Sequence, residues 1–150
     1  MSDRSGIYAI YKGKGCAKFS QLPPRFKQQG DVSFVDKNGA ILLEVAPGNG
    51  DRNNPQWFWD QKITFAIGIP DICSLLEKGG EKRLFHDHGG TPKVLQFTPG
   101  EGKYEGTWMM NISQGKGDSR QSISVPFSSG EWQVLLRLLV GSVPMMLNWK

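Results

Sequence analysis

The stretch YKGKGCAKF, residues 11–19, combines cations, glycines and rings at a spacing that suits contact with a polyanion. Lys12 and Lys14 offer ammonium donors on one face of a strand, and the glycines let a phosphate backbone approach the main chain closely. Tyr11 and Phe19, at the two ends, are able to stack on unpaired bases. The same residues also fit two other interpretations: a phosphate-cradling loop of a nucleotide enzyme and a plain surface hairpin.

The nucleotide-enzyme interpretation is disfavoured by spacing. A loop of the type G-x-x-x-x-G-K-[ST] places backbone amides and a lysine around a nucleotide's phosphates. The KGKG segment, residues 12–15, lacks this spacing and is not followed by a helix signal. PGEGK and QGKGD have the same weakness, so we interpret both as hairpin turns whose Lys103 and Lys116 are solvated or make accessory phosphate contacts.

A second aromatic group, WFW at residues 57–59, follows the polar segment DRNNPQ. On a strand, Trp57 and Trp59 would point to one side and Phe58 to the other, so at least one ring should lie at an outer surface. We expect Trp59 to pack in the core, continuous with Phe65. Trp57 and Phe58 are then the better candidates for contact with bases.

His86 and His88 in FHDHGG share a strand face and invite a metal assignment. Zinc usually takes three or four protein ligands, and the sequence has neither a third histidine nor a pair of neighbouring cysteines. We therefore favour a turn capped by Asp87 over a small hydrolase that would use these three residues. Since the nucleophile motif G-x-S-x-G is also absent, we expect no enzyme activity, no metal and no cofactor.

The basic residues are concentrated at the start of the chain. Residues 1–30 carry six basic residues and one acidic residue, a net charge of +5. The whole chain has a net charge of +4, so the rest of it is close to neutral. Such asymmetry suggests a polyanionic partner, because phosphate contacts supply most of the salt-dependent affinity for nucleic acids. A solvated basic edge that prevents strand aggregation explains the charge equally well.

The 150 residues, of which 38% are apolar and 11% aromatic, are the size of one globular domain, which we place at residues 1–150. No run of about 18 apolar residues occurs, so no membrane span is expected, and the start MSDRSGIYAI does not resemble a signal peptide. Cys16 and Cys73 lie far apart, which suits a reducing interior. Cys16 should be an inert small residue on a strand.

The elements that must position these residues are mostly strands. The first half predicts strands at 7–11, 17–22, 32–35 and 40–47, a long strand from Trp57 to Ile67, and a short helix from Pro70 to Leu76. The second half predicts strands at 82–88, 93–99, 105–113 and 121–127. Ser128 and Glu131 form a capping box that opens a longer final helix. Short turns between consecutive strands indicate antiparallel sheets rather than a doubly wound nucleotide fold.

The final helix is apolar on more than one face. Trp132, Leu135 and Leu139 repeat at helical spacing, while Val134 and Leu138 lie opposite them. A helix on the surface of a monomer normally has a charged outer face, so we expect this one to pack against copies of the chain. A helix enclosed between the sheets of a single chain is the alternative.

Several stretches together resemble the Whirly family of plant single-stranded DNA-binding proteins. YKGKGCA resembles the family's K-G-K-A-A-L signature. The further matches, in family order, are LLEVAPGNG, WFWDQKITFAIG, LFHDH, NIS, SVPFSSGEWQVL and VPMMLNW. The chain departs from the family's Y-D-W at Trp57-Phe58-Trp59 and from its F-F-H-D-P at residues 84–88.

This resemblance implies an α+β fold of two antiparallel four-stranded sheets packed crosswise with two helices, in the order β4-α-β4-α, and a homotetramer whose helices pack centrally. It also implies binding of single-stranded DNA between sheet edges of neighbouring subunits, with little sequence preference. The signature is implicated in assembling tetramers into larger particles. Carried over, it maps to Lys12, Gly13, Lys14, Gly15, Cys16 and Ala17.

We therefore expect a non-enzymatic single-stranded DNA-binding protein that protects organellar DNA, acts in DNA repair and genome maintenance, and takes part in transcription regulation. The chloroplast is the expected compartment, with the mitochondrion or nucleus as alternatives. An RNA-binding or splicing factor and a non-catalytic protein-interaction scaffold are the alternative functions. Phosphate contacts are expected from Lys12, Lys14, Lys18 and Lys62, and stacking from Tyr11, Phe19 and Phe58.

Overall fold

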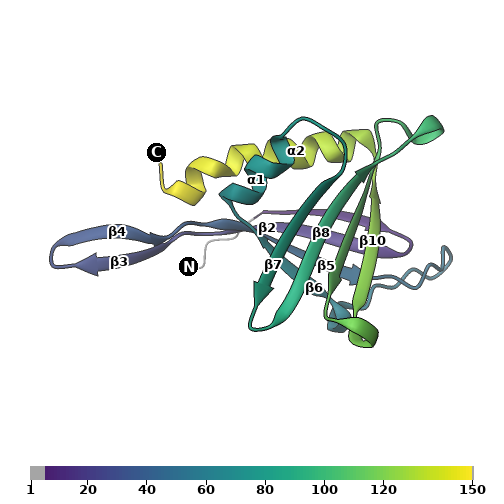
Figure 1. Cartoon of the computed structure of the whole chain (residues 1–150), viewed down its shortest axis with the longest axis horizontal. Helices are drawn as coiled ribbons and strands as arrows, with labels where there is room; N and C mark the ends of the chain where they lie inside the picture. Colours follow the sequence, from purple (N-terminus) through teal and green to yellow (C-terminus); the bar gives the residue numbers. More distant parts are fainter. Residues whose placement is uncertain (1–5, 150) are drawn as a thin grey trace.

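The computed structural model describes residues 6–149, apart from the side chain of His88. Within them the chain forms two four-stranded antiparallel sheets, a two-stranded arm and two α-helices (Figure 1). The first sheet has the order β1–β2–β5–β6. Its strands are β1 (Ile7–Lys12), β2 (Gly15–Leu22), β5 (Ala40–Pro47) and β6 (Ile63–Ile67).

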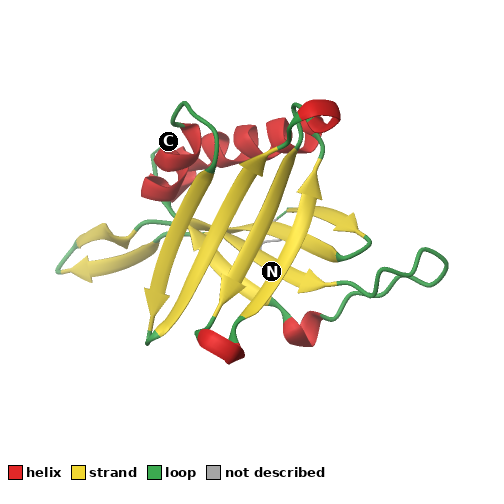
Figure 2. Ribbon diagram, turned by 45° about the vertical axis from the view of Figure 1, so that its right-hand side comes forward, coloured by secondary structure: helices red, strands yellow, loops and turns green. Residues whose placement is uncertain are grey.

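The second sheet has the order β10–β9–β8–β7, and its strands run across those of the first sheet (Figure 2). Its strands are β7 (Lys82–His88), β8 (Thr91–Pro99), β9 (Trp108–Gln114) and β10 (Gln121–Phe127). Short 3-10 helices, Gly102–Tyr104 and Gly117–Ser119, lie in the turns on either side of β9. The prediction of two crossed antiparallel sheets is confirmed.

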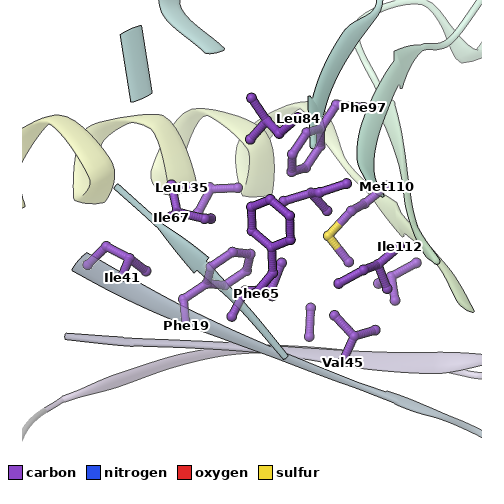
Figure 3. Packing of buried hydrophobic residues seen from close by; sticks show 14 of the residues in the cluster. Phe19, Ile41, Val45, Phe65, Ile67, Leu84, Phe97, Met110, Ile112 and Leu135 are labelled. Carbon is purple, nitrogen blue, oxygen red and sulfur yellow. The ribbon is translucent and has the colours of Figure 1, made fainter. Parts of the chain in front are cut away.

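The core lies between the two sheets because alternate residues of each strand are apolar. In the first sheet Ile10, Ala17, Val45 and Ile63 are paired in one row, and in the second sheet Ile123, Ile112, Leu95 and Leu84 form another. All eight are at most 5% exposed. Phe65 and Phe97 approach each other from opposite layers (Figure 3). Burying a side chain of this size stabilises the fold by about 1.5–3 kcal/mol.

The two helices cover one end of the core. Helix α1 (Ile69–Leu76) begins with Pro70 in its first turn, as predicted, and buries Ile72 and Leu75. Helix α2 (Ser129–Leu147) begins at the predicted capping box, in which Glu131 N donates to Ser128 Oγ and Ser128 N donates to Glu131 Oε1. None of the described helices is long and apolar enough to cross a membrane.

Helix α2 packs on the core with one face and leaves the opposite face open. The first face carries Trp132, Leu135 and Leu139, each at most 5% exposed. Away from this face Val134 and Leu138, one turn apart, are 44% and 47% exposed, and Val140, on the other flank of the helix beside α1, is 47% exposed. The alternative of a helix enclosed between the sheets of one chain is therefore wrong, and the apolar outer face is left without a cover from the described residues.

Two predicted segments differ from the structure. The long strand predicted from Trp57 to Ile67 is wrong, because Trp57 forms only an isolated bridge with Gly48 and a 3-10 helix, Trp59–Gln61, follows it before β6 begins. Conversely, β4 (Val32–Lys37) contains the strand predicted at 32–35, but its partner β3 (Arg25–Gln29) is not among the predicted strands. These strands extend the β2–β5 pair into an exposed arm that leaves the body of the molecule (Figure 1).

Candidate nucleic-acid interface

The turn between β1 and β2 docks onto the connection between β5 and β6. We name these the lysine turn (Lys12–Gly15) and the β5–β6 loop (Gly48–Lys62). Gly48 N donates to Lys14 O at 2.9 Å, and Gly50 N donates to Gly13 O at the same distance. Trp57 Nε1 donates to Lys12 O, also at 2.9 Å. The two groups that the sequence indicated separately thus form one surface, at the right-hand end of the molecule in Figure 1.

Aromatic rings cover the outer face of the first sheet at this surface. Tyr11 is 52% exposed and lies edge-on to the half-buried Trp57, with 4.9 Å between ring centroids. Phe58 is 37% exposed, on the turn before the 3-10 helix. Lys18 Nζ lies 4.1 Å from the centroid of the Trp59 ring, a cation–π contact. Trp59 is therefore half-buried at the surface, and its predicted place in the core beside Phe65 is wrong.

Phe19 does not belong to this ring surface. It is 4% exposed and packs edge-on against Phe127 of the second sheet, with ring centroids 6.3 Å apart. Its side chain points to the face of β2 opposite that of Lys18, since neighbouring residues of a strand alternate. The prediction that Phe19 stacks on bases is therefore wrong, and the ring is part of the core.

The four candidate lysines differ in whether a side chain of the protein already contacts their ammonium group. Lys12 Nζ lies 2.9 Å from Glu131 Oε1 of α2, and Lys62 Nζ lies 2.6 Å from Glu44 Oε2 of β5. Lys18 is held over Trp59. Lys14 is exposed, and within residues 6–149 the structure gives it no ion pair. Among the four, Lys14 is thus the ammonium most available to an incoming anion.

The ion pair with Lys12 also lowers the pKa of Glu131. Burial raises the pKa of this carboxyl, but the backbone and hydroxyl of Ser128 and the Lys12 ammonium together hold it below its usual range. Glu131 is therefore ionised at neutral pH and ties the lysine turn to the first turn of α2.

Lys14 borders a hollow of about 400 Å³ between the two sheets. Its other lining residues are Pro47, Gly48, Asn49 and Gly50 from the first sheet's end and Ser122, Ile123 and Ser124 from β10. Asn111 Nδ2 donates to both serine hydroxyls, at 2.9 Å and 2.8 Å. Alternation in QSISVPF already places these serines on the outer face of β10, but no local pattern indicates that β10 lies beside Lys14.

The remaining residues of the signature are buried. Other side chains cover Gly15, Cys16 and Ala17. These residues therefore support the lysine turn from below and are not exposed to an incoming ligand. A Cβ atom on Gly15 would lie 2.9 Å from Val125 Cγ2, closer than packed carbon atoms approach. Burial raises the pKa of Cys16 to about 11, against the opposing effects of Lys18 and a hydrogen bond with Tyr11, so the thiol stays protonated.

The histidine segment takes part in packing. His86 Nε2 lies 3.0 Å from Asp71 Oδ2 of α1, and its ring stacks on Phe65 with 4.0 Å between centroids. In the part of the chain that the structure describes, no group of three histidine, cysteine, aspartate or glutamate side chains is placed to hold a metal ion. The site is thus a surface of cations, rings and hydroxyls.

Comparison with known proteins agrees with this arrangement. A family model described as "Whirly transcription factor" matches residues 10–138. The chain is 28% identical to "Single-stranded DNA-binding protein WHY1, chloroplastic" of Zea mays and 26% identical to the protein of the same name from Arabidopsis thaliana. These alignments cover 95% of the chain and 56% and 57% of the relatives, so the chain spans little more than half the length of the curated relatives it matches.

Solved structures show the same fold. The crystal structure of WHY1 from Arabidopsis thaliana has a TM-score of 0.86 at 25% identity, over 99% of this chain and 89% of that one. The plant transcriptional regulator PBF-2 has a TM-score of 0.85 at 24% identity, over 99% and 86% of the two chains. Because the family model covers most of the chain and the crossed sheets superpose throughout, the protein belongs to the Whirly transcription factor family.

Proposed function

We propose that the chain binds single-stranded DNA with little sequence preference, without catalysing a reaction. The observation that carries this proposal is the free Lys14 ammonium on a turn that follows the exposed ring of Tyr11 and docks onto the loop that carries the exposed ring of Phe58. Single-stranded binding needs this mixture, because cations follow the phosphates while rings stack on bases. The names of the relatives from Zea mays and Arabidopsis thaliana support DNA as the ligand.

In the proposed mode, Lys14 neutralises a phosphate and the hydroxyls of Ser122 and Ser124 hydrogen-bond to the backbone nearby. Tyr11 and Phe58 each stack on a base, which contributes about 1–3 kcal/mol per base. Stacking accepts any base, since every base has a π-face, so little sequence preference follows. Lys12 and Lys62 hold the surface in place through Glu131 and Glu44 rather than supplying free charge.

A titration with labelled oligonucleotides over a range of salt tests this proposal. We expect affinity for single-stranded DNA well above that for duplex DNA of the same sequence, falling linearly with salt on a log-log plot. A competing RNA of the same sequence distinguishes an RNA-binding or splicing role. Absence of retention on any oligonucleotide at moderate salt would refute the proposal and favour a protein-interaction scaffold.

We further propose that the chain assembles as a homotetramer through the outer face of α2. Val134 and Leu138, one turn apart on the 19-residue helix, are 44% and 47% exposed, and a monomer seldom leaves neighbouring apolar side chains on a helix in water. Light scattering should give four times the 16.7 kDa mass of the chain. A mass of one chain at micromolar concentration would refute the assembly, while larger particles would indicate association of tetramers.

The cellular role that fits such a protein is protection of organellar DNA, with action in DNA repair and genome maintenance and in transcription regulation. The chloroplast is the compartment we propose, because both curated relatives are named chloroplastic. Fluorescent tagging of the full-length gene product tests this placement, and signal confined to the mitochondrion or nucleus would contradict it.

A further inference from the structure

A second basic hollow lies on the outer face of the second sheet, away from the lysine turn. Its volume is about 300 Å³, and Arg83 from β7 meets Lys116 and Arg120 from the β9–β10 turn around it. The rest of the lining is small or apolar apart from Ser113, and no carboxylate belongs to it. Over residues 6–149, none of the three cations has an ion pair.

The hollow is held in shape by its own hydrogen bonds. Gly115 N donates to Pro92 O at 3.1 Å, which fastens the turn to β8, and Arg120 N donates to Gly117 O at 3.2 Å. Gly115 has a φ of 95°, a conformation that glycine adopts without strain. Arg120 Nη2 donates to Ser113 Oγ at 3.2 Å, so the guanidinium lies against the sheet with further N–H groups free for an anion.

A polar track joins this hollow to the one at Lys14. Residues paired directly across the strands share a face of the sheet. One outer row is Ser124, Asn111, Gln96 and Arg83, and the next is Ser122, Ser113, Val94 and Phe85. Both rows thus start at the serines of the Lys14 hollow and end on β7. Three interstrand steps of about 4.8 Å separate β10 from β7, so the track is roughly 14 Å long.

An exposed ring on this track favours a nucleic-acid strand over a small free anion. Phe85, at the end of the second row, is 60% exposed. Carboxylates are present near the track but outside the hollow: Glu81 accepts from Gln96 Nε2 at 2.5 Å, Asp87 follows Phe85 on β7, and Asp118 lies in the β9–β10 turn. The combination of free cations and a solvent-exposed ring repeats that of the first site.

We propose that the hollow of Arg83, Lys116 and Arg120 is a second phosphate subsite, which binds the backbone of the same single strand after it has crossed the outer face of the second sheet from Lys14. This inference rests on the proposed function, because it extends the path of the strand. Once a strand is bound at Lys14, its binding to the second hollow is intramolecular. An oligonucleotide long enough to reach both hollows should therefore bind more tightly than one that fills only the first.

The test compares two double variants of the full chain on two oligo-dT lengths, about 4 and about 16 nucleotides, the limits of common site sizes. One variant, Lys116→Gln with Arg120→Gln, removes two charges from the hollow. The matched control, Lys37→Gln with Lys78→Gln, removes two exposed charges elsewhere. Circular dichroism and light scattering confirm that both variants keep the wild-type fold and mass.

For the long oligonucleotide, we expect the hollow variant to reduce the slope of log K against log salt by about 1.4, which is 0.7 for each lost phosphate contact on a single strand. The control should leave this slope near wild type, and the short oligonucleotide should bind all three proteins alike. Equal slopes for the hollow variant and the control on the long oligonucleotide would overturn the inference while leaving the proposed function intact. Absence of binding by the wild type would overturn both.

Discussion

Lys14 and Lys12 are two positions apart, and the structure predicts different effects for their removal. Lys14→Ala deletes an exposed ammonium at the hollow between the sheets. Loss of one phosphate contact on a single strand reduces the slope of log K against log salt by about 0.7. Between 50 and 200 mM salt, affinity of the wild type should therefore fall roughly 3-fold more than that of the variant. Fluorescence anisotropy with a labelled oligo-dT measures both slopes.

Lys12→Ala should leave that slope near wild type, because the ammonium is already 2.9 Å from Glu131 Oε1. The side chains of the pair are 31% and 27% exposed, so solvent screens their attraction. A pair of this kind stabilises a protein by about 0.2–1 kcal/mol. We therefore expect the melting temperature to fall by up to about 4 °C, at roughly 2–4 °C per kcal/mol for a chain of this size.

Glu131→Gln provides the matched control. Glutamine retains the capping geometry at α2 but releases the Lys12 ammonium, so DNA affinity should be equal to or higher than that of the wild type. The reasoning would be refuted if Lys12→Ala lost as much salt slope as Lys14→Ala, since the ion pair would then not withhold the Lys12 charge from the strand.

Three further predictions concern packing, acidity and assembly. Gly15→Ala should lower the free energy of unfolding in urea by about 1–3 kcal/mol, because its Cβ meets Val125, whereas Gly13→Ala, with no side chain near, should be close to neutral. Cys73 should react with a thiol reagent in the native protein and the buried Cys16 only after unfolding. Since burial raises the pKa of Cys16 from 9.0 to about 11 in the folded chain, the free energy of unfolding should fall as the pH rises from 9.0 towards 11, and this fall should be smaller in Cys16→Ala. Leu138→Glu, on the open face of α2, should reduce the mass in light scattering without altering circular dichroism, and an unchanged mass would contradict assembly through this face.

The strands of the second sheet and both helices could be predicted from local patterns. In QSISVPF the alternation that buries Ile123, Val125 and Phe127 is the same alternation that exposes Ser122 and Ser124. The capping box at Ser128 fixed the start of α2, because its two hydrogen bonds involve residues only three apart. Where one short segment contains all the interactions that decide its conformation, the sequence is sufficient.

The surface around Trp57 could not be predicted in this way. WFW alternates as a strand does, yet its backbone is set by contacts with distant residues: Phe58 N donates to Pro47 O, and Trp57 Nε1 donates to Lys12 O. The misassignment of Phe19 has a different cause, since alternation from Lys18 already places it on the opposite face. If Lys18 faces solvent on a strand, the next residue, Phe19, must face the core.

The departures of this chain from the K-G-K-A-A-L signature fall on residues that pack rather than residues that face solvent. Gly15 lies against Val125 of the second sheet, and Cys16 is covered beside Tyr11, whereas the lysines of the signature are retained. Since Gly15 is the point at which the lysine turn touches β10, its lack of a side chain lets Lys14 come close to Ser122 and Ser124. Substitution there should change the distance between Lys14 and the serines of β10, and so the fit of a bound strand, even though position 15 itself is buried.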